Sequence, residues 1–136
     1  MADKVCPAER SRIMAAVKSK DTTPEMVVRR LVHGLGFRYR LHVRGMPGTP
    51  DLVFRSKQRI VNVSGCFWHM HGCGRCRIPA TRPDYWLGKL RRNRERDKRT
   101  LGQLRRAGWR VLVVWECQTR DLQALEARLR RFLDAP

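Results

Sequence analysis

Cysteine and histidine are concentrated in residues 64–76, which read SGCFWHMHGCGRC. Thiolate sulfur and imidazole nitrogen at this density are typical of a metal site, and sulfur-rich ligation favours zinc over magnesium. A zinc site with four protein ligands is structural rather than catalytic. The candidate ligands, taken over the whole chain, are Cys66, His69, His71, Cys73, Cys76 and Cys117.

Spacing leaves the ligand set open. Cys73 and Cys76 are separated by two residues, which is the most familiar local spacing for zinc. Cys117 lies beside this segment if the strands expected at 59–63 and 109–116 are neighbours. Buried thiols without metal are the alternative. Three cysteines within eleven residues, with histidines between them, favour the metal.

A second set of residues suits phosphodiester hydrolysis. Asp51 follows Pro50 and opens an apolar segment, so it is either a turn residue or a functional charge. A carboxylate on the same rim as His69 would hold a hard divalent ion. A tetrahedral site needs only four ligands, so His69 can remain unligated and is a candidate general base. Asp97 would fix its tautomer, or would pair with flanking arginines instead.

Three large aromatic residues accompany the metal-like segment. Phe67 and Trp68 are consecutive and cannot both be buried in one direction, so at least one points outward. Exposed aromatic rings on a basic surface suit base stacking or wedging between base pairs. Trp86 begins an apolar helical face and has a strong alternative as a core residue.

Charge and length limit the classes of protein. The 136 residues suffice for one domain, and the net charge is +18, from 30 Lys+Arg against 12 Asp+Glu. Nucleic acid is the expected partner, because an acidic membrane would require a basic helix with a broad apolar face. No stretch approaches the roughly 20 apolar residues of a membrane span. The protein is therefore expected to be cytoplasmic, where structural disulfides are rare.

Periodicity predicts the helices that position these residues. Residues 8–18 have helical character and suit an arm. A threonine cap, a proline and an early acid begin a helix at 22–25, which Gly34 and Gly36 end. Residues 81–107 form one long helix, followed by a final helix at 122–132. One face of the long helix carries Trp86, Leu90, Asn93, Asp97, Leu101 and Leu104.

The expected strands lie between these helices. Apolar and polar residues alternate over 37–43, and short apolar segments follow at 51–54 and 60–63. Residues 109–115 form an apolar central strand. Three antiparallel strands and a helical crossover to a fourth predict a mixed sheet with helices on its faces.

Several of these segments resemble the very-short-patch repair (Vsr) mismatch endonucleases. The string GCFWH at 65–69 is the most specific. The resemblance runs from about residue 8 to residue 118, which is nearly the whole chain. Its other motifs are RSxxM at 10–14, DTxxE at 21–25, PGTPD at 47–51, PATR at 79–82, WL at 86–87, NxERD at 93–97 and GWRVLxVWEC at 108–117.

The resemblance implies a restriction-endonuclease-like α/β core of the PD-(D/E)XK type, with a mixed β-sheet flanked by helices and a structural zinc site. Residues 1–136 would form a single domain, with 1–20 as a DNA-contacting arm. The implied enzyme is a monomer that nicks double-stranded DNA 5′ of the thymine in a T:G mismatch, using Mg²⁺ and leaving a 5′-phosphate. Such mismatches arise when 5-methylcytosine deaminates, and repair proteins would act after the nick.

The resemblance also implies roles in catalysis. Asp51 and the main-chain carbonyl of Val63 would ligate Mg²⁺, and Glu25 would hold a water molecule bound to that ion. His69 would activate the attacking water, and Asp97 would orient His69.

The implied zinc and DNA contacts come from other residues. Zinc would be held by a set that omits Cys76, namely Cys66, His71, Cys73 and Cys117. The aromatic residues Phe67, Trp68 and Trp86 would enter the mismatch from the major groove, and Met14 would wedge from the other groove.

Ser64 departs from the family pattern, because relatives commonly carry His or Asp at this position. A second polar helper near the metal is thereby weakened or replaced, which affects rate more than reaction type. Two alternatives follow. One is a zinc-containing DNA-binding protein with weak or no catalysis, and the other is a nuclease for a different mismatch or a structured nucleic acid.

Overall fold

The computed structural model describes residues 22–66 and 82–135. Their order of helix, three strands, helix, strand and helix confirms the prediction, and the helix expected at 8–18 lies outside them. The elements are α2 (Thr23–Gly34), β1 (Arg40–Leu41), β2 (Leu52–Phe54), β3 (Arg59–Ser64), α3 (Pro83–Arg106), β4 (Arg110–Trp115) and α4 (Leu122–Asp134), with short 3₁₀ segments η1 (Arg55–Lys57) and η2 (Glu116–Thr119).

The four strands form one sheet in the order β1-β2-β3-β4. β1 pairs antiparallel with β2, and β2 pairs antiparallel with β3, with Leu52 opposite Val61. β3 and β4 are parallel, and α3 is the crossover between them. The predicted mixed sheet is therefore confirmed. The beginning of β2 meets the end of β3, which brings Asp51 next to Asn62 and Val63.

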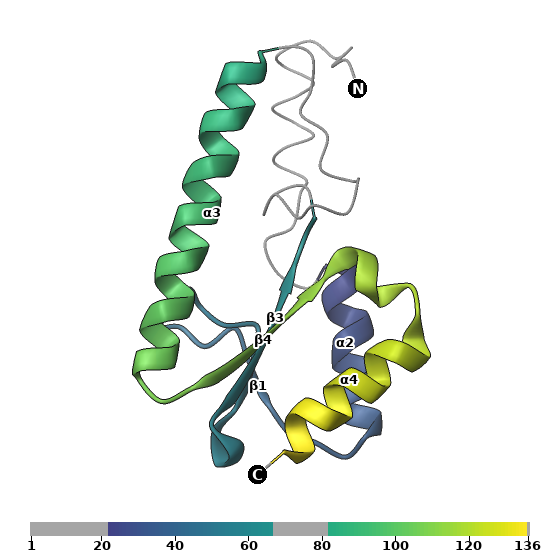
Figure 1. Cartoon of the computed structure of the whole chain (residues 1–136). Helices are drawn as coiled ribbons and strands as arrows, with labels where there is room; N and C mark the ends of the chain where they lie inside the picture. Colours follow the sequence, from purple (N-terminus) through teal and green to yellow (C-terminus); the bar gives the residue numbers. More distant parts are fainter. Residues whose placement is uncertain (1–21, 67–81, 136) are drawn as a thin grey trace.

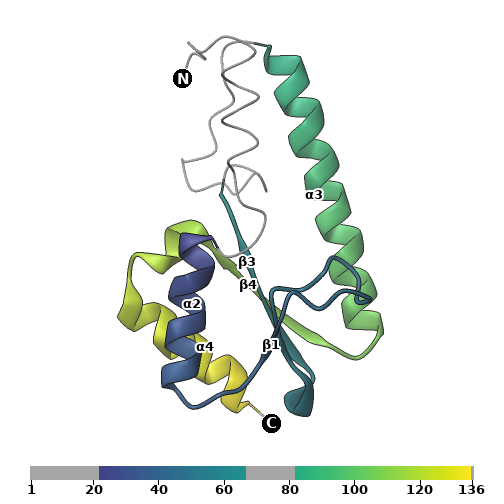
Figure 2. The same cartoon turned by 180° about the vertical axis from the view of Figure 1, so that it is seen from behind.

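Helices cover both faces of the sheet. Figure 1 shows α3 on one side and α2 with α4 on the other, and Figure 2 shows the same layers from behind. Alternate strand residues supply the two cores. Leu52, Phe54 and Val61 pack with the apolar faces of α2 and α4. On the other face Val53 and Ile60 pack with Leu104 of α3.

The start of α2 follows from its sequence. The side chain of Thr22 accepts a hydrogen bond from the backbone N–H of Glu25 at 3.3 Å, and a proline occupies the first turn. These features satisfy one end of the helix and confirm the predicted cap. Because α2 buries Val28 and Val32 against the sheet, the first turn lies beside the strands, and Glu25 is directed inward at 2% exposure.

The strand predicted at 37–43 was too long, since only Arg40–Leu41 pairs as β1. The extended backbone ends at His42, whose φ of 45° lies in the left-handed region. The bend also changes the face of the sheet on which the following side chains pack. Tyr39 and Leu41 pack on the core under α2, whereas Val43 packs on the opposite core.

The stripe predicted for α3 is confirmed. Trp86, Leu90 and Leu104 are buried, and the positions between them on the same face are half-buried. The remaining arginines of 91–99 are exposed. Within 22–66 and 82–135, no helix is long and apolar enough to cross a bilayer.

Candidate functional site: an oxygen-rich centre and a cysteine pair

Both the backbone N–H and the side chain of Asp51 are hydrogen-bonded to residues of β3. Its N–H donates to Oδ1 of Asn62 at 3.0 Å, and its Oδ2 accepts from the N–H of Val63 at 2.8 Å. A carboxylate restrained by a strand N–H keeps a defined orientation, which is a requirement for binding a metal ion. The carboxylate of Asp51 is therefore oriented toward the end of β3, as a functional charge at this position would require.

Three side chains from different elements meet at this point. Glu25 comes from the first turn of α2, His42 follows β1, and Asp51 precedes β2. One potential ligand atom from each lies within 4.8 Å of the other two. We call Glu25, His42 and Asp51 the oxygen-rich centre. Its carboxylate oxygens are the ligand type that Mg²⁺ and other hard divalent ions prefer, so the donor set fits such an ion.

The Glu25 carboxylate is buried yet well supplied with hydrogen-bond donors. His42 Nε2 lies 3.0 Å from both Oε1 and Oε2. Arg29 Nη1 lies 3.4 Å from Oε2, one helical turn further along α2. The side chain of Glu25 is 3% exposed, so these polar neighbours offset the cost of removing a carboxylate from water.

His42 was not predicted as a site residue, because it is one of the polar positions in the alternating segment 37–43. The hairpin register contains the signal that would have found it. Leu41 pairs with Leu52, so the next residues outward are His42 and Asp51. The His42 N–H indeed donates to the Asp51 carbonyl at 3.0 Å. A pairing register cannot be read from alternation alone.

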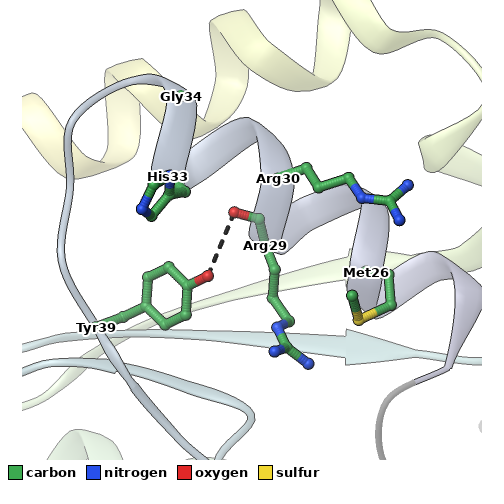
Figure 3. A pocket seen from close by; sticks show the side chains of 6 residues that line it. All are labelled: Met26, Arg29, Arg30, His33, Gly34 and Tyr39. Atoms are coloured by element: carbon green, nitrogen blue, oxygen red, sulfur yellow. Dashed lines mark hydrogen bonds between the residues drawn. The ribbon is translucent and has the colours of Figure 1, made fainter.

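A shallow pocket of about 300 Å³ lies along α2, and its lining includes Arg29, which contacts Glu25. Figure 3 shows its lining, with the Arg29 side chain reaching from α2 past the pocket toward the strands. The Tyr39 hydroxyl donates to the main-chain carbonyl of Arg29 at 3.4 Å. This hydrogen bond connects the residue before β1 to α2. The lining residues are Met26, Arg29, Arg30, His33, Gly34 and Tyr39.

Two of the predicted zinc ligands are brought together on the other side of β3. Cys66 is buried two residues beyond β3, and Cys117 is half-buried in η2, just beyond β4. The N–H of Cys117 donates to Cys66 Sγ at 3.4 Å. The parallel pairing of β3 with β4 places them together, as predicted for the case that these strands are neighbours. We call them the cysteine pair.

The other predicted residues in the described ranges take these positions. Ser64 ends β3 and is half-buried opposite Trp115 of β4. Asp97 is half-buried on α3, and Trp86 is buried at 5% exposure near the start of α3. The burial of Trp86 agrees with its alternative interpretation as a core residue of this chain. Met14, Phe67, Trp68, His69, His71, Cys73 and Cys76 lie outside the described residues.

A mixed sheet flanked by helices, with two carboxylates gathered where β2 begins, is compatible with the core of a nuclease. Comparison with known proteins makes the class specific, since residues 2–75 match the family DNA mismatch endonuclease Vsr. The chain belongs to this family.

Relatives of the chain support that assignment over nearly its full length. It is 51% identical to the type II nicking enzyme V.XorIIP of Xanthomonas oryzae pv. oryzae over 98% of both chains. It is 41% identical to the DNA mismatch endonuclease Vsr of Escherichia coli K12, over 92% of this chain and 80% of the relative. The type II nicking enzyme V.NmeAIP of Neisseria meningitidis is 37% identical over 98% and 95%, respectively.

Proposed function

We propose that this chain is a DNA mismatch repair endonuclease that nicks one strand 5′ of the thymine in a T:G mismatch. The observation that carries the proposal is the oxygen-rich centre in a chain of the Vsr family. Two relatives bear names that describe the two halves of the activity, one a nicking enzyme and the other a mismatch endonuclease.

Mg²⁺ is the proposed catalytic ion, with Asp51 as its principal ligand and Glu25 beside it. The Val63 carbonyl is a suitable third oxygen, because the N–H and C=O of a strand residue point toward the same neighbouring strand. The N–H of Val63 already reaches Asp51, so its carbonyl faces the same side. A divalent ion held there supplies charge stabilisation at the scissile phosphate.

Proton transfer is proposed to depend on His69 and Asp97. His69 takes a proton from the attacking water, and Asp97 holds the imidazole in the correct tautomer. The position of Asp97 supports its part. It lies half-buried on the inward stripe of α3, between Leu90 and Leu104. Ser64, at the end of β3, is the proposed polar helper near the ion.

Zinc is proposed as a structural ion on Cys66, His71, Cys73 and Cys117. The contact between the backbone of Cys117 and Cys66 Sγ supports this set, since it brings thiols from two separate parts of the chain together. Their soft sulfur donors fit zinc and do not fit magnesium. A zinc ion would then tie the end of β3 to the end of β4.

The DNA contacts are proposed to combine charge and aromatic insertion. The net charge of +18 and the exposed arginines of α3 favour the phosphate backbone. Phe67 and Trp68 enter the mismatch, and Met14 wedges from the opposite groove on an arm at 1–20. Trp86 joins them only if DNA binding exposes it, because it is buried in the chain without DNA. One chain acts alone as a single domain.

The test is a nicking assay with Mg²⁺ and a duplex that carries one T:G pair, with each strand labelled separately. We expect a nick only in the T strand, 5′ of the thymine, and none in a matched duplex. Addition of a chelator should abolish the nick. Tight binding without a nick would instead support the DNA-binding alternative, and stronger cleavage of another mismatch or of RNA would support the third interpretation.

A further inference from the structure

The imidazole of His42 lies against the carboxylate of Glu25. The imidazole Nε2 lies 3.0 Å from each carboxylate oxygen, so it is directed at the middle of the carboxylate rather than at one corner. Both side chains are largely removed from water, at 17% exposure for His42 and 3% for Glu25. A hydrogen-bond donor at this position restricts rotation of the carboxylate. The lone pairs of the two oxygens that point away from His42 are not used by this contact.

The backbone of His42 has an unusual conformation at the same place. Its φ of 45° is in the left-handed region, which a residue with a Cβ rarely adopts. Such strained positions gather at functional sites, where the surrounding structure maintains them. The N–H of His42 also donates to the carbonyl of Asp51 at 3.0 Å. His42 therefore contacts Asp51 through its backbone and Glu25 through its side chain.

We propose that His42 is a positioning residue that sets the Glu25 carboxylate beside Asp51 for binding of the catalytic divalent ion. This inference rests on the proposed function, because it presumes that the oxygen-rich centre binds the ion. His42 acts through Glu25 rather than as a ligand. Its Nε2 is directed at the Glu25 oxygens, and oxygen donors match a hard ion better than imidazole does.

The first variant is His42→Asn, since asparagine tolerates a left-handed backbone and its shorter side chain does not reach Glu25. The matched control is His33→Asn, which changes an exposed histidine on the last turn of α2. Mn²⁺ is titrated into the zinc-loaded, DNA-free chain by calorimetry. We expect His42→Asn to weaken Mn²⁺ binding by about 10- to 100-fold and the control to leave it unchanged.

A second variant, His42→Gln, separates positioning from packing. Its longer amide side chain can still donate to a carboxylate, so we expect it to recover part of the Mn²⁺ affinity that His42→Asn loses. The Mg²⁺ concentration for half-maximal nicking should follow the same order, while the Kd for a T:G duplex without metal stays unchanged. A purely structural role would lower the melting temperature of both variants together and would not spare DNA binding.

Asp51→Asn is the reference that tells the two proposals apart. If Asp51→Asn abolishes Mn²⁺ binding and His42→Asn leaves it intact at an unchanged melting temperature, positioning by His42 is overturned and the proposed function stands. If Asp51→Asn itself binds Mn²⁺ normally, the oxygen-rich centre is not the metal site, and both proposals fail. If His42→Asn does not fold, His42→Gly keeps the left-handed backbone, and the same Mn²⁺ titration decides.

Discussion

The oxygen-rich centre and the cysteine pair lie near the same end of β3 but differ in their donor atoms and in the elements that supply them. The first gathers carboxylates and an imidazole from α2, the bend after β1 and the start of β2. The second joins two thiols that follow the ends of the parallel strands β3 and β4. Their chemistry differs accordingly, because hard oxygen donors select ions such as Mg²⁺ and soft sulfur donors select zinc.

Under the proposed function, this difference would separate catalysis from stability within a short distance along the chain. Val63 serves the oxygen-rich centre through its N–H, and Cys66 begins the cysteine pair three residues later. The proposed ion at the first site would exchange with solvent during turnover, whereas the proposed zinc ion at the second would contribute to folding. Substitutions in the two regions should therefore fail in different assays.

The largest effect is expected from Asp51→Asn. Loss of the proposed principal Mg²⁺ ligand should reduce the nicking rate by about 10³-fold or more, or about 4 kcal/mol at the transition state. Zinc content and affinity for a T:G duplex should remain normal. Single-turnover kinetics measures the rate, with Asp134→Asn, an exposed aspartate at the end of α4, as the control. Unchanged nicking would remove Asp51 from the mechanism.

Cys117→Ala should show the opposite pattern. The variant should lose zinc and about 4 kcal/mol of unfolding free energy, with a melting temperature lower by about 10 °C or more. Elemental analysis should give about one zinc per chain for the parent and for the control Cys6→Ala, which changes a cysteine outside the candidate ligands. A fully folded parent without zinc would contradict the structural zinc site.

A smaller effect is expected from Gly48→Ala in the loop before Asp51. Gly48 has φ of 75°, and an added Cβ would overlap the Thr100 methyl of α3. Gly45→Ala is the matched control, since Gly45 has φ of 87° but open space around its Cβ. Both variants pay the backbone cost, and Gly48→Ala should lose about 1–3 kcal/mol more by chemical denaturation. Equal losses would show that the loop does not need this contact.

The smallest effect is expected from Arg130→Ala, away from both regions. Arg130 pairs with Glu126 at 3.4 Å along α4, and both side chains are largely exposed, at 60% and 43%. Such pairs contribute little, so the unfolding free energy should change by less than about 0.5 kcal/mol. Nicking and zinc content should stay at the parent level. A larger change in either would show that α4 is coupled to the metal regions.

The sequence predicted those parts of the fold that depend on periodicity. The stripe from Trp86 to Leu104 on α3 and the cap at Thr22 needed only local spacing, and both are confirmed. The contact between Cys66 and Cys117 also depends on the pairing of β3 with β4. That pairing could be expected because both strands are apolar and a crossover helix joins them.

What the sequence did not predict depends on pairing register and backbone strain. The alternation over 37–43 suggested a continuous strand, but the left-handed backbone at His42 turns the chain to the other face of the sheet. The same bend directs the imidazole to Glu25, a contact between residues seventeen positions apart. Nothing in the local pattern distinguishes such a histidine from an exposed one.

The proposed separation of two metal sites is tested most directly by crystals of the zinc-loaded chain soaked in Mn²⁺. Anomalous scattering measured on either side of the zinc edge distinguishes the two metals. We expect a manganese peak between Asp51 and Glu25 and a separate zinc peak beside Cys66 and Cys117. A single metal position, or manganese bound by the cysteine pair with none at Asp51, would contradict the division of catalysis and structure between the two regions.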